Sequence, residues 1–337
     1  MRAYYLNILF AASLLLLTSC REDLCYEHSQ KAMISLSYEQ EWERDYGMAH
    51  PANWNAETHG GDYDSHRPSL PESVNMHVYS QESGNTSLTF LGRDGGEANL
   101  GREQCDILLY NNDTEYVLID DNASVVEMTA TTTTRSRSTL EPMHLGERTV
   151  SAPDVLYGTY LTDVPKTEAH KETTMNAVLR PLVYTYIIRY EFEQGIEYAK
   201  LARGAIAGMA EKVFLKDGST GSDKATVLYD CEIQPWGVIA KVNTFGVPDF
   251  PGEHYRDGAV VNPALDFVVN LEVMCANGKI KTFEQNVTEQ IRKQPRGGVL
   301  TVKGLAIDGA GMNSGFNASV DDWGEWTDVE LPGFEVK

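Results

Sequence analysis

The sequence predicts an all-β protein. Helical periodicity is almost absent from the 337 residues. Short runs of β-branched and aromatic residues recur instead, separated by clusters of Gly, Asn, Asp and Pro. Apolar and polar side chains alternate within these runs, as they do in strands that bury one face. About seven runs fall in each half of the chain, and a domain usually takes ~100–200 residues. We therefore expect two β-sandwich domains in tandem.

The first half contains seven expected strands, which span residues 31–41, 73–80, 87–91, 105–110, 115–120, 124–134 and 155–161. The run 124–134 is rich in threonine, whose β-branched side chain suits a half-solvated strand. A long loop rich in Gly, Asn, Asp and His, residues 50–71, separates the first two strands. The polar run 162–172 contains Pro165 and is the expected link between domains. We place the two domains at 31–165 and 166–337.

Longer runs predict the strands of the second half, at residues 177–192, 204–216, 226–232, 236–245, 265–275, 280–286, 298–305 and 320–331. Pro181 lies inside the longest run and predicts an edge position or a bend there. Asn277 and Gly278 stand between two runs and predict a hairpin.

The composition is acidic, and this excludes some classes of partner. The chain carries 28 Lys and Arg against 49 Asp and Glu, a formal net charge of −21. Nucleic-acid binding needs a basic face, so we expect no nucleic-acid partner. Electrostatic adsorption to anionic lipid is disfavoured for the same reason.

The N-terminus has the features of a lipoprotein signal peptide. Arg2 supplies a positive charge, and the apolar run 6–17 is too short to cross a bilayer as a helix. It ends in Leu-Thr-Ser-Cys at 17–20, which resembles the bacterial lipobox, in which the cysteine is acylated and becomes the mature N-terminus. The alternative, a plain secretory peptide ending near Ala12, leaves Cys20 unexplained. We expect a signal peptide at 1–19, lipidation at Cys20 and a lipidated tether at 20–30, whose charged start (21–23) is similar to a surface-export signal.

Four further cysteines remain, namely Cys25, Cys105, Cys231 and Cys275. Two disulfides with three connectivities are open to them, and free buried thiols are the alternative. No pair has the CxxC spacing of a zinc or redox site.

The sequence contains no GxSxG elbow, Walker A motif or EF-hand loop. We therefore expect no catalysis and no cofactor. The sequence leaves one alternative open, a glycosidase with a pair of catalytic carboxylates, because the two acids of such a pair come from distant positions in the chain. His50, His59 and His66 lie with Asp62 and Asp64 in the long loop, but their spacing matches no ligand scaffold, so no metal site is expected.

Tryptophans are candidates for a binding surface. Trp42, Trp54 and Tyr63 flank the long loop, although tryptophans in a β-sandwich are more often core. Trp323 and Trp326 stand three apart on an expected strand and point to opposite faces, so at least one is a candidate ligand or interface aromatic. Exposed tryptophans that stack on sugar rings would make a surface glycan-binding lipoprotein, the alternative function.

Several segments together carry a family resemblance. They are the start of the mature chain (20–28), the strand 184–190 with the run GAIAGMA at 204–210, and the strand 267–272 with 277–279 and NVTEQI at 286–291. These segments resemble the fimbrillin superfamily of type V pili, specifically its lipidated, anchor-like members.

The resemblance implies two tandem transthyretin-like β-sandwiches and a role as pilus anchor or as accessory or tip subunit in adhesion. It implies fimbrial subunits as partners, joined by β-strand addition, with a host or glycan receptor as a further partner. It also implies a lipid-anchored place at the surface of the outer membrane. Stalk subunits of the family lose their first strand to an Arg-directed protease, and Arg44 is the candidate processing site here. An anchor should keep that strand, because cleavage would release the body from its lipid.

Overall fold

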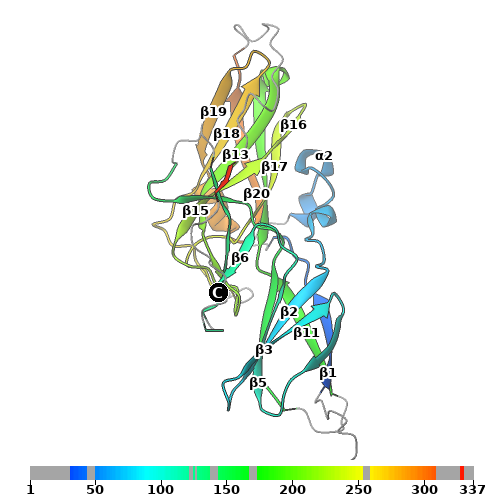
Figure 1. Ribbon diagram of the computed structural model, residues 1–337. Helices are drawn as coiled ribbons and strands as arrows, with labels where there is room; N and C mark the ends of the chain where they lie inside the picture. Colours follow the sequence, from blue (N-terminus) through cyan, green and yellow to red (C-terminus); the bar gives the residue numbers. More distant parts are fainter. Residues whose placement is uncertain are drawn as a thin grey trace, which may run out of the picture.

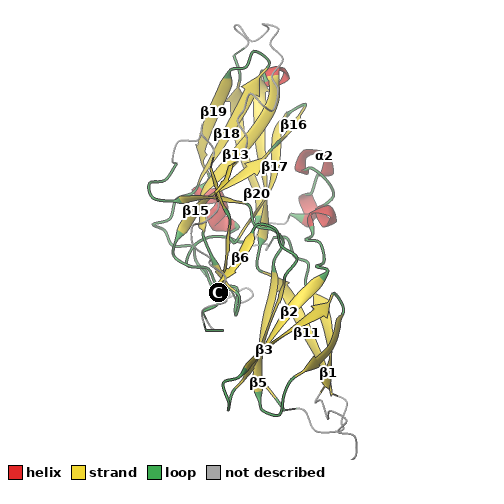
Figure 2. Ribbon diagram, viewed as in Figure 1, coloured by secondary structure: helices red, strands yellow, loops and turns green. Residues whose placement is uncertain are grey.

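The structure is a computed structural model that describes residues 31–43, 50–120, 124–125, 127–136, 143–166, 173–252, 259–308 and 327–329. Strands make up most of these residues, and the few helices are short (Figure 2). The all-β prediction is confirmed. No helix in these ranges is long and apolar enough to span a membrane.

The elements follow one another along the chain as β1 (Lys31–Tyr38), η1 (Pro51–Asn53), α2 (Ala56–His59), η2 (Tyr63–His66), β2 (Ser73–Ser80), β3 (Thr86–Gly92), β4 (Gly95–Asn99), β5 (Cys105–Asn111), β6 (Val117–Asp120), β7 (Thr129–Thr132), β8 (Thr134–Ser136), β9 (Arg148–Ser151), β10 (Tyr157–Val164), β11 (Thr173–Pro181), β12 (Tyr184–Gln194), η3 (Ile196–Tyr198), β13 (Ala199–Ala210), β14 (Val213–Phe214), β15 (Lys224–Asp230), β16 (Glu232–Gln234), β17 (Gly237–Thr244), β18 (Val268–Cys275), β19 (Ile280–Asn286), α3 (Thr288–Lys293), β20 (Gly298–Ala306) and β21 (Thr327–Val329).

The first group of strands forms a closed barrel in the order β1-β11-β10-β5-β2-β3-β4, in the lower part of Figure 1. Its interior is apolar, because alternate residues of each strand point inward; Ile34, Met76 and Ile107 are among the residues at its core. The expectation of a separate two-sheet sandwich here needs correction. β1 pairs with β11 on one side and β4 on the other, and this closes the sheet on itself.

The second group packs a four-stranded sheet, β16-β17-β12-β20, against a seven-stranded sheet, β19-β18-β13-β15-β9-β8-β21. One core lies between them and draws on both, with Tyr186, Ile206 and Leu271 among its buried residues. The expected hairpin at Asn277 and Gly278 is confirmed. It joins β18 to β19, and Gly278 takes the left-handed conformation that the turn requires (φ 76°).

A three-stranded sheet, β14-β7-β6, lies where the two groups meet. Its residues share a core with the outer side of the barrel, where Leu108 and Tyr110 of β5 pack with Val213 and Leu182. This third core joins the barrel to the sandwich.

Several strand pairings cross the expected division between residues 165 and 166. β11 follows that point but pairs with β1 and β10 of the barrel, while β9 precedes it and pairs with β15. The run 162–172, expected to link the domains, therefore connects two barrel strands. The apolar run 177–192 is split instead: Pro181 ends β11, and the chain enters the sandwich at Tyr184, which confirms the bend expected at that proline. The division into two folding units stays a prediction, and the pairing favours its place at Leu182 and Val183.

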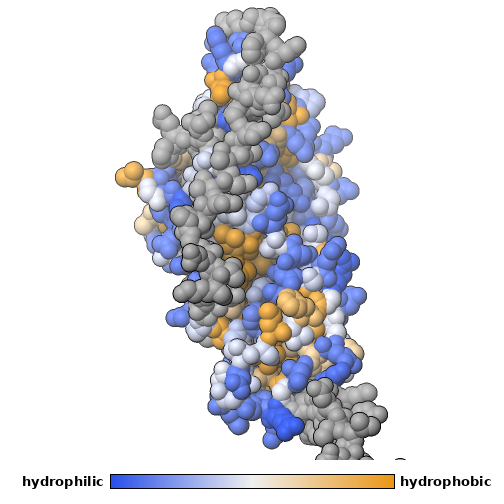
Figure 3. All heavy atoms as spheres, viewed as in Figure 1, coloured by the Kyte–Doolittle hydropathy of each residue, from blue (hydrophilic) through white to orange (hydrophobic). Residues whose placement is uncertain are grey.

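The long loop carries α2 and the two short 3-10 helices, which lie beside β17 in Figure 1. It packs on the outer face of the four-stranded sheet, where Trp42, Ile187 and Ile239 form a small core of their own. Hydrophilic residues cover most of the described surface in the view of Figure 3, in keeping with the acidic composition.

Candidate functional site

The most informative site is the segment 31–43, called here the first-strand segment, which consists of β1 and the five residues after it. β1 lies between two strands. It pairs in parallel with β11 from Ala32 to Tyr38 and antiparallel with β4 from Lys31 to Ser35. The closed barrel therefore depends on β1, because without it β11 and β4 would each present an unpaired edge.

Alternate side chains of β1 fill the barrel. Ala32 and Ile34 have almost no exposed surface (0% and 1%). The backbone of β1 also approaches β4 closely. A Cβ added to Gly95 would lie 1.9 Å from the carbonyl oxygen of Ile34, and Gly95 has a positive φ of 107°, so this position requires glycine.

Tyr38 is the last residue of β1 and fixes the end of this strand to the barrel. Its hydroxyl donates a hydrogen bond to the carbonyl of Arg93 (2.8 Å), and its ring meets that of Tyr157 edge-on at 5.2 Å. Burial, reinforced by the charge of Asp94, raises the pKa of Tyr38 to about 12. The phenol therefore stays protonated and keeps its donor at physiological pH.

Trp42 fixes the other end of the segment to the sandwich. It is 2% exposed and packs against the rings of Trp54, Tyr63 and His66, at 5.2–5.6 Å between centroids. Its carbonyl oxygen accepts a hydrogen bond from the backbone N–H of Thr185 (2.9 Å). The first-strand segment thus joins the barrel to the sandwich through two separate sets of contacts.

Glu43 completes this attachment. It is 5% exposed, and its carboxylate accepts a hydrogen bond from the Tyr63 hydroxyl. The candidate processing site, Arg44, comes directly after this buried residue. Arg44 itself, the lipidation site Cys20 and the candidate aromatics Trp323 and Trp326 lie outside the described residues.

The long loop brings together the residues that the sequence singled out as a weak metal candidate. His59 stacks on Trp54 at 4.3 Å, His66 lies buried against Trp42 and Trp54, and His50 shares a hydrogen bond with the side chain of Gln294 (3.1 Å). No group of three His, Cys, Asp or Glu side chains arranged to hold a metal occurs within the described ranges. The histidines contribute instead to an aromatic cluster on the four-stranded sheet.

Gln290 of α3 (Thr288–Lys293) and Gln294, the residue directly after this helix, cover a strand edge. β20 is the last strand of the four-stranded sheet. Gln290 donates to the carbonyl of Thr301 and accepts from its N–H (2.9 and 2.8 Å), and Gln294 does the same with Val299 (2.6 and 2.9 Å). The two side chains therefore satisfy backbone groups two residues apart on β20, at an edge that would otherwise be open.

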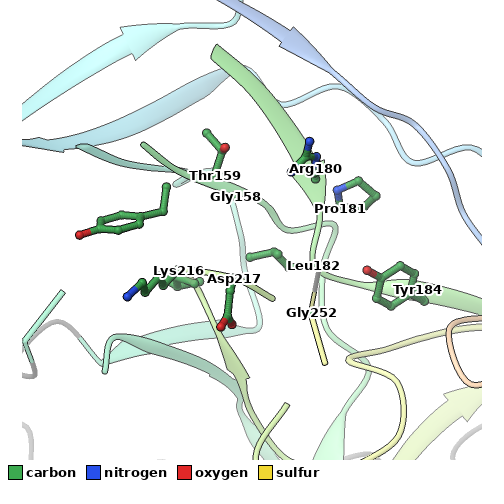
Figure 4. A pocket seen from close by; sticks show the side chains of 11 residues that line it. Gly158, Thr159, Arg180, Pro181, Leu182, Tyr184, Lys216, Asp217 and Gly252 are labelled. Carbon is green, nitrogen blue, oxygen red and sulfur yellow. The ribbon is translucent and has the colours of Figure 1, made fainter. Parts of the chain in front are cut away.

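A small pocket of about 140 Å³ lies at the joint of barrel and sandwich, where Thr159 and Arg180 face Lys216 and Asp217 (Figure 4). The Lys216 ammonium lies 5.3 Å from the ring centroid of Tyr160. The volume is below the ~300 Å³ at which small-molecule sites usually begin, so we interpret the pocket as part of the joint.

Two of the cysteines, Cys105 and Cys275, are buried free thiols. Burial raises the pKa of each, as expected for thiols that fill space in a core. The alternative of a disulfide is thereby removed for these two residues.

Some important residues had no sequence signal that marked them. The edge-covering glutamines belong to this group, because their role depends on which strand they meet. The spacing of Gln290 and Gln294, four apart in the short run before the last long strand, is the one local cue.

The comparisons with known proteins agree with the fold. A family described as a domain of unknown function (DUF5119) matches residues 62–230, half of the chain. No curated protein matches the sequence significantly. Several solved structures are similar.

One is a candidate adhesin from Bacteroides ovatus, 17% identical, with a TM-score of 0.55 over 93% of this chain and 98% of that one. Another is the fimbrial anchor protein Mfa2 from Porphyromonas gingivalis, 10% identical, with a TM-score of 0.41 over 80% and 90% of the two chains. A third, from Bacteroides thetaiotaomicron, is described as a candidate polysaccharide-binding protein of the DUF1812 family; it is 12% identical, with a TM-score of 0.41 over 80% and 89%. The first similarity shows a shared fold.

Proposed function

This chain belongs to the family described as a domain of unknown function, DUF5119, and we propose that it is a lipid-anchored protein of the outer-membrane surface that serves as the anchor or an accessory subunit of a pilus. The observation that carries the proposal is the first-strand segment. A strand that follows the lipidated tether is built into the barrel, and the residues after it are fixed to the sandwich.

This arrangement suits an anchor, because it transmits force. A pull on the body acts along β1 when the lipid holds the chain upstream of Lys31. The parallel ladder to β11 and the antiparallel ladder to β4 then resist together, because both run along the direction of the pull. The buried Trp42 adds a second attachment on the sandwich. The body would therefore remain bound to its lipid under tension.

The same contacts favour retention of the first strand. Trp42 and Glu43 are buried immediately before Arg44. Loss of the first-strand segment after a cut at Arg44 would break both β1 ladders and remove the buried Trp42 from its ring contacts. This opposes release of the strand, which suits an anchor and does not suit a stalk subunit that must lose its first strand.

Fimbrial subunits are the proposed partners, joined by β-strand addition. In the described part of the chain the barrel is closed and the edge of β20 is covered by glutamines. β19 is the long strand at an edge of the seven-stranded sheet. Its backbone is therefore the proposed template for a strand from a neighbouring subunit.

The Bacteroides ovatus neighbour is described as a candidate adhesin, and this supports a place at the cell surface. The lipobox at 17–20 supports attachment by acyl chains, because the acidic body would be repelled by anionic lipid. Binding and mechanical attachment account for the described features without catalysis.

Fractionation of cells tests the proposal. Wild-type protein is expected to sediment with outer membranes, whereas Cys20→Ser protein should appear in the soluble fraction and leave pili in the medium. Arg44→Gln is the control and should behave as wild type. Pili that stay attached to Cys20→Ser cells would contradict the anchor role, and assembly that requires Arg44 would favour a stalk or tip subunit.

A further inference from the structure

A second cavity lies between the long loop and the outer face of the four-stranded sheet. Its volume is about 310 Å³, at the lower end of the ~300–1,000 Å³ typical of small-molecule sites. Ile187 of β12 and Ile239 of β17 line it from the sheet, and His59 and His66 line it from the loop. All of its lining residues lie in the described part of the chain.

His66 is the unusual residue of this cavity. It is 4% exposed, yet its Nε2 has no hydrogen-bond partner among the described residues. The rings of Trp42 and Trp54 lie 5.4 Å from it and fix its orientation. A buried polar atom without a partner costs free energy, so a ligand that supplied a hydrogen bond here would gain by it.

The surroundings of His66 decide which kind of hydrogen bond it offers. Burial lowers the pKa of His66, and the charge of Lys241 lowers it further, so the ring is neutral at pH 7. Hydrogen bonding to the backbone of His59 and Gly61 acts in the opposite direction and raises the pKa of His66. Since Nε2 has no partner within the described ranges, a neutral ring protonated on Nδ1 has its Nε2 lone pair free to accept a hydrogen bond.

The sheet supplies complementary groups at fixed register positions. Lys241 pairs across the ladder with Ile187, and Glu232 pairs with Ile239. An ammonium and a carboxylate thus flank two apolar side chains on the same face. Lys241 offers donors and Glu232 offers acceptors, while the isoleucines offer an apolar surface.

We propose that this cavity binds one neutral sugar residue, such as the end of a glycan chain. A pyranose has hydroxyl groups that both donate and accept, and an apolar C–H face that fits the isoleucines. The acceptor of His66, the donor of Lys241 and the acceptor of Glu232 match such a ring. Asp230 and Glu232 at the rim oppose an acidic sugar, and the volume suits one unit rather than several.

Saturation-transfer NMR with the mature chain tests this, using the methyl glycosides of glucose, galactose, mannose and N-acetylglucosamine, with methyl glucuronide as the acidic comparator. At least one neutral glycoside is expected to bind, and the glucuronide to bind more weakly. His66→Phe keeps the ring packing but removes Nε2, and should weaken binding at least tenfold. Lys241→Met keeps an apolar side chain at this exposed position but removes the ammonium donor, so it should also weaken binding.

His77→Phe is the matched control, since His77 lies on β2 of the barrel, stacked on Tyr110, and this variant should bind as wild type. Binding to none of the four neutral glycosides would overturn the proposal. Unchanged affinity in folded His66→Phe and Lys241→Met would overturn it as well. The result does not depend on the pilus role, because lipid attachment and sugar binding are measured separately.

Discussion

The carbonyl oxygen of Trp42 accepts a hydrogen bond from the backbone N–H of Thr185, at 2.9 Å. Trp42 follows the first barrel strand, and Thr185 is the second residue of β12, the strand by which the chain enters the sandwich. This contact therefore connects the start of the mature body to the middle of the chain.

Trp42→Ala should destabilise the protein by about 3–5 kcal/mol, because it leaves a cavity where a large ring was buried. Urea denaturation measures this. Trp236→Ala is the control on the same sheet, where the ring is half-buried beneath Arg189, and its cost should be smaller. An equal loss of stability in the two variants would show that Trp42 contributes no more to stability than Trp236 does.

Gly95→Ala should loosen β1 from β4, because the new methyl group would collide with the Ile34 carbonyl. Gly84→Ala is a matched control: it also has a positive φ (69°), but nothing lies within 4 Å of the added carbon. In both variants the left-handed backbone should lower the free energy of unfolding by about 1–2 kcal/mol. Only Gly95→Ala should lower it further, because of the collision. Hydrogen exchange of residues 32–38 should accelerate in that variant, and equal exchange in both would refute the close approach.

Replacing Gln290 and Gln294 together by Ala should expose the edge of β20. Each lost hydrogen bond is worth about 0.5–1.5 kcal/mol, and the open edge favours association between copies. Analytical ultracentrifugation should show more self-association than in Gln285→Ala, which alters an exposed glutamine on β19. A monomeric double variant would mean that another feature covers this edge.

Stability should fall as the pH is lowered through 6.5, and His66 should account for part of the fall. Its folded pKa is lowered by burial and by Lys241, with His59 as a lesser like charge, so the unfolded chain takes up a proton more readily. The contribution of neutral His66 is complete above its unfolded pKa and is lost as the pH falls toward the folded value. The melting temperature of His66→Phe should therefore depend less on pH between 7.5 and 5.5 than that of wild type, and parallel curves would contradict this.

Sugar binding should follow the same titration. Protonation converts Nε2 of His66 from an acceptor to a donor. The other charged or titratable groups that line the cavity are Lys241, His59, Asp230, Cys231 and Glu232. Affinity for the neutral glycoside should be constant from pH 8 to 6.5 and weaken below that range. Affinity that rises on acidification would show that the acceptor is not His66.

Local patterns in the sequence predicted the strands that alternation marks clearly. The hairpin at Asn277 and Gly278 and the break at Pro181 followed from turn chemistry and from the missing N–H of proline. β4 and β9 were not predicted, because β4 begins with two glycines and β9 has only four residues. Neither run alternates long enough to be recognised.

Contacts between distant residues could not be predicted in this way. Ala32 pairs with Thr173 and closes the barrel, and Arg148 of β9 pairs with Ala225 in the sandwich. No local pattern specifies such partners, so the expected boundary at residue 165 missed both pairings. The site shows the same limit: the sequence drew attention to Trp42 and His66 individually, but only the fold brings His66 to Ile239 and Lys241.

The central claim is that the first strand keeps the body attached to its lipid. Mass spectrometry of the N-terminal peptide from protein extracted from native membranes tests this most directly. The account predicts a chain that begins at acylated Cys20 and continues uncut through Arg44. A mature chain that begins at Asp45 would contradict it.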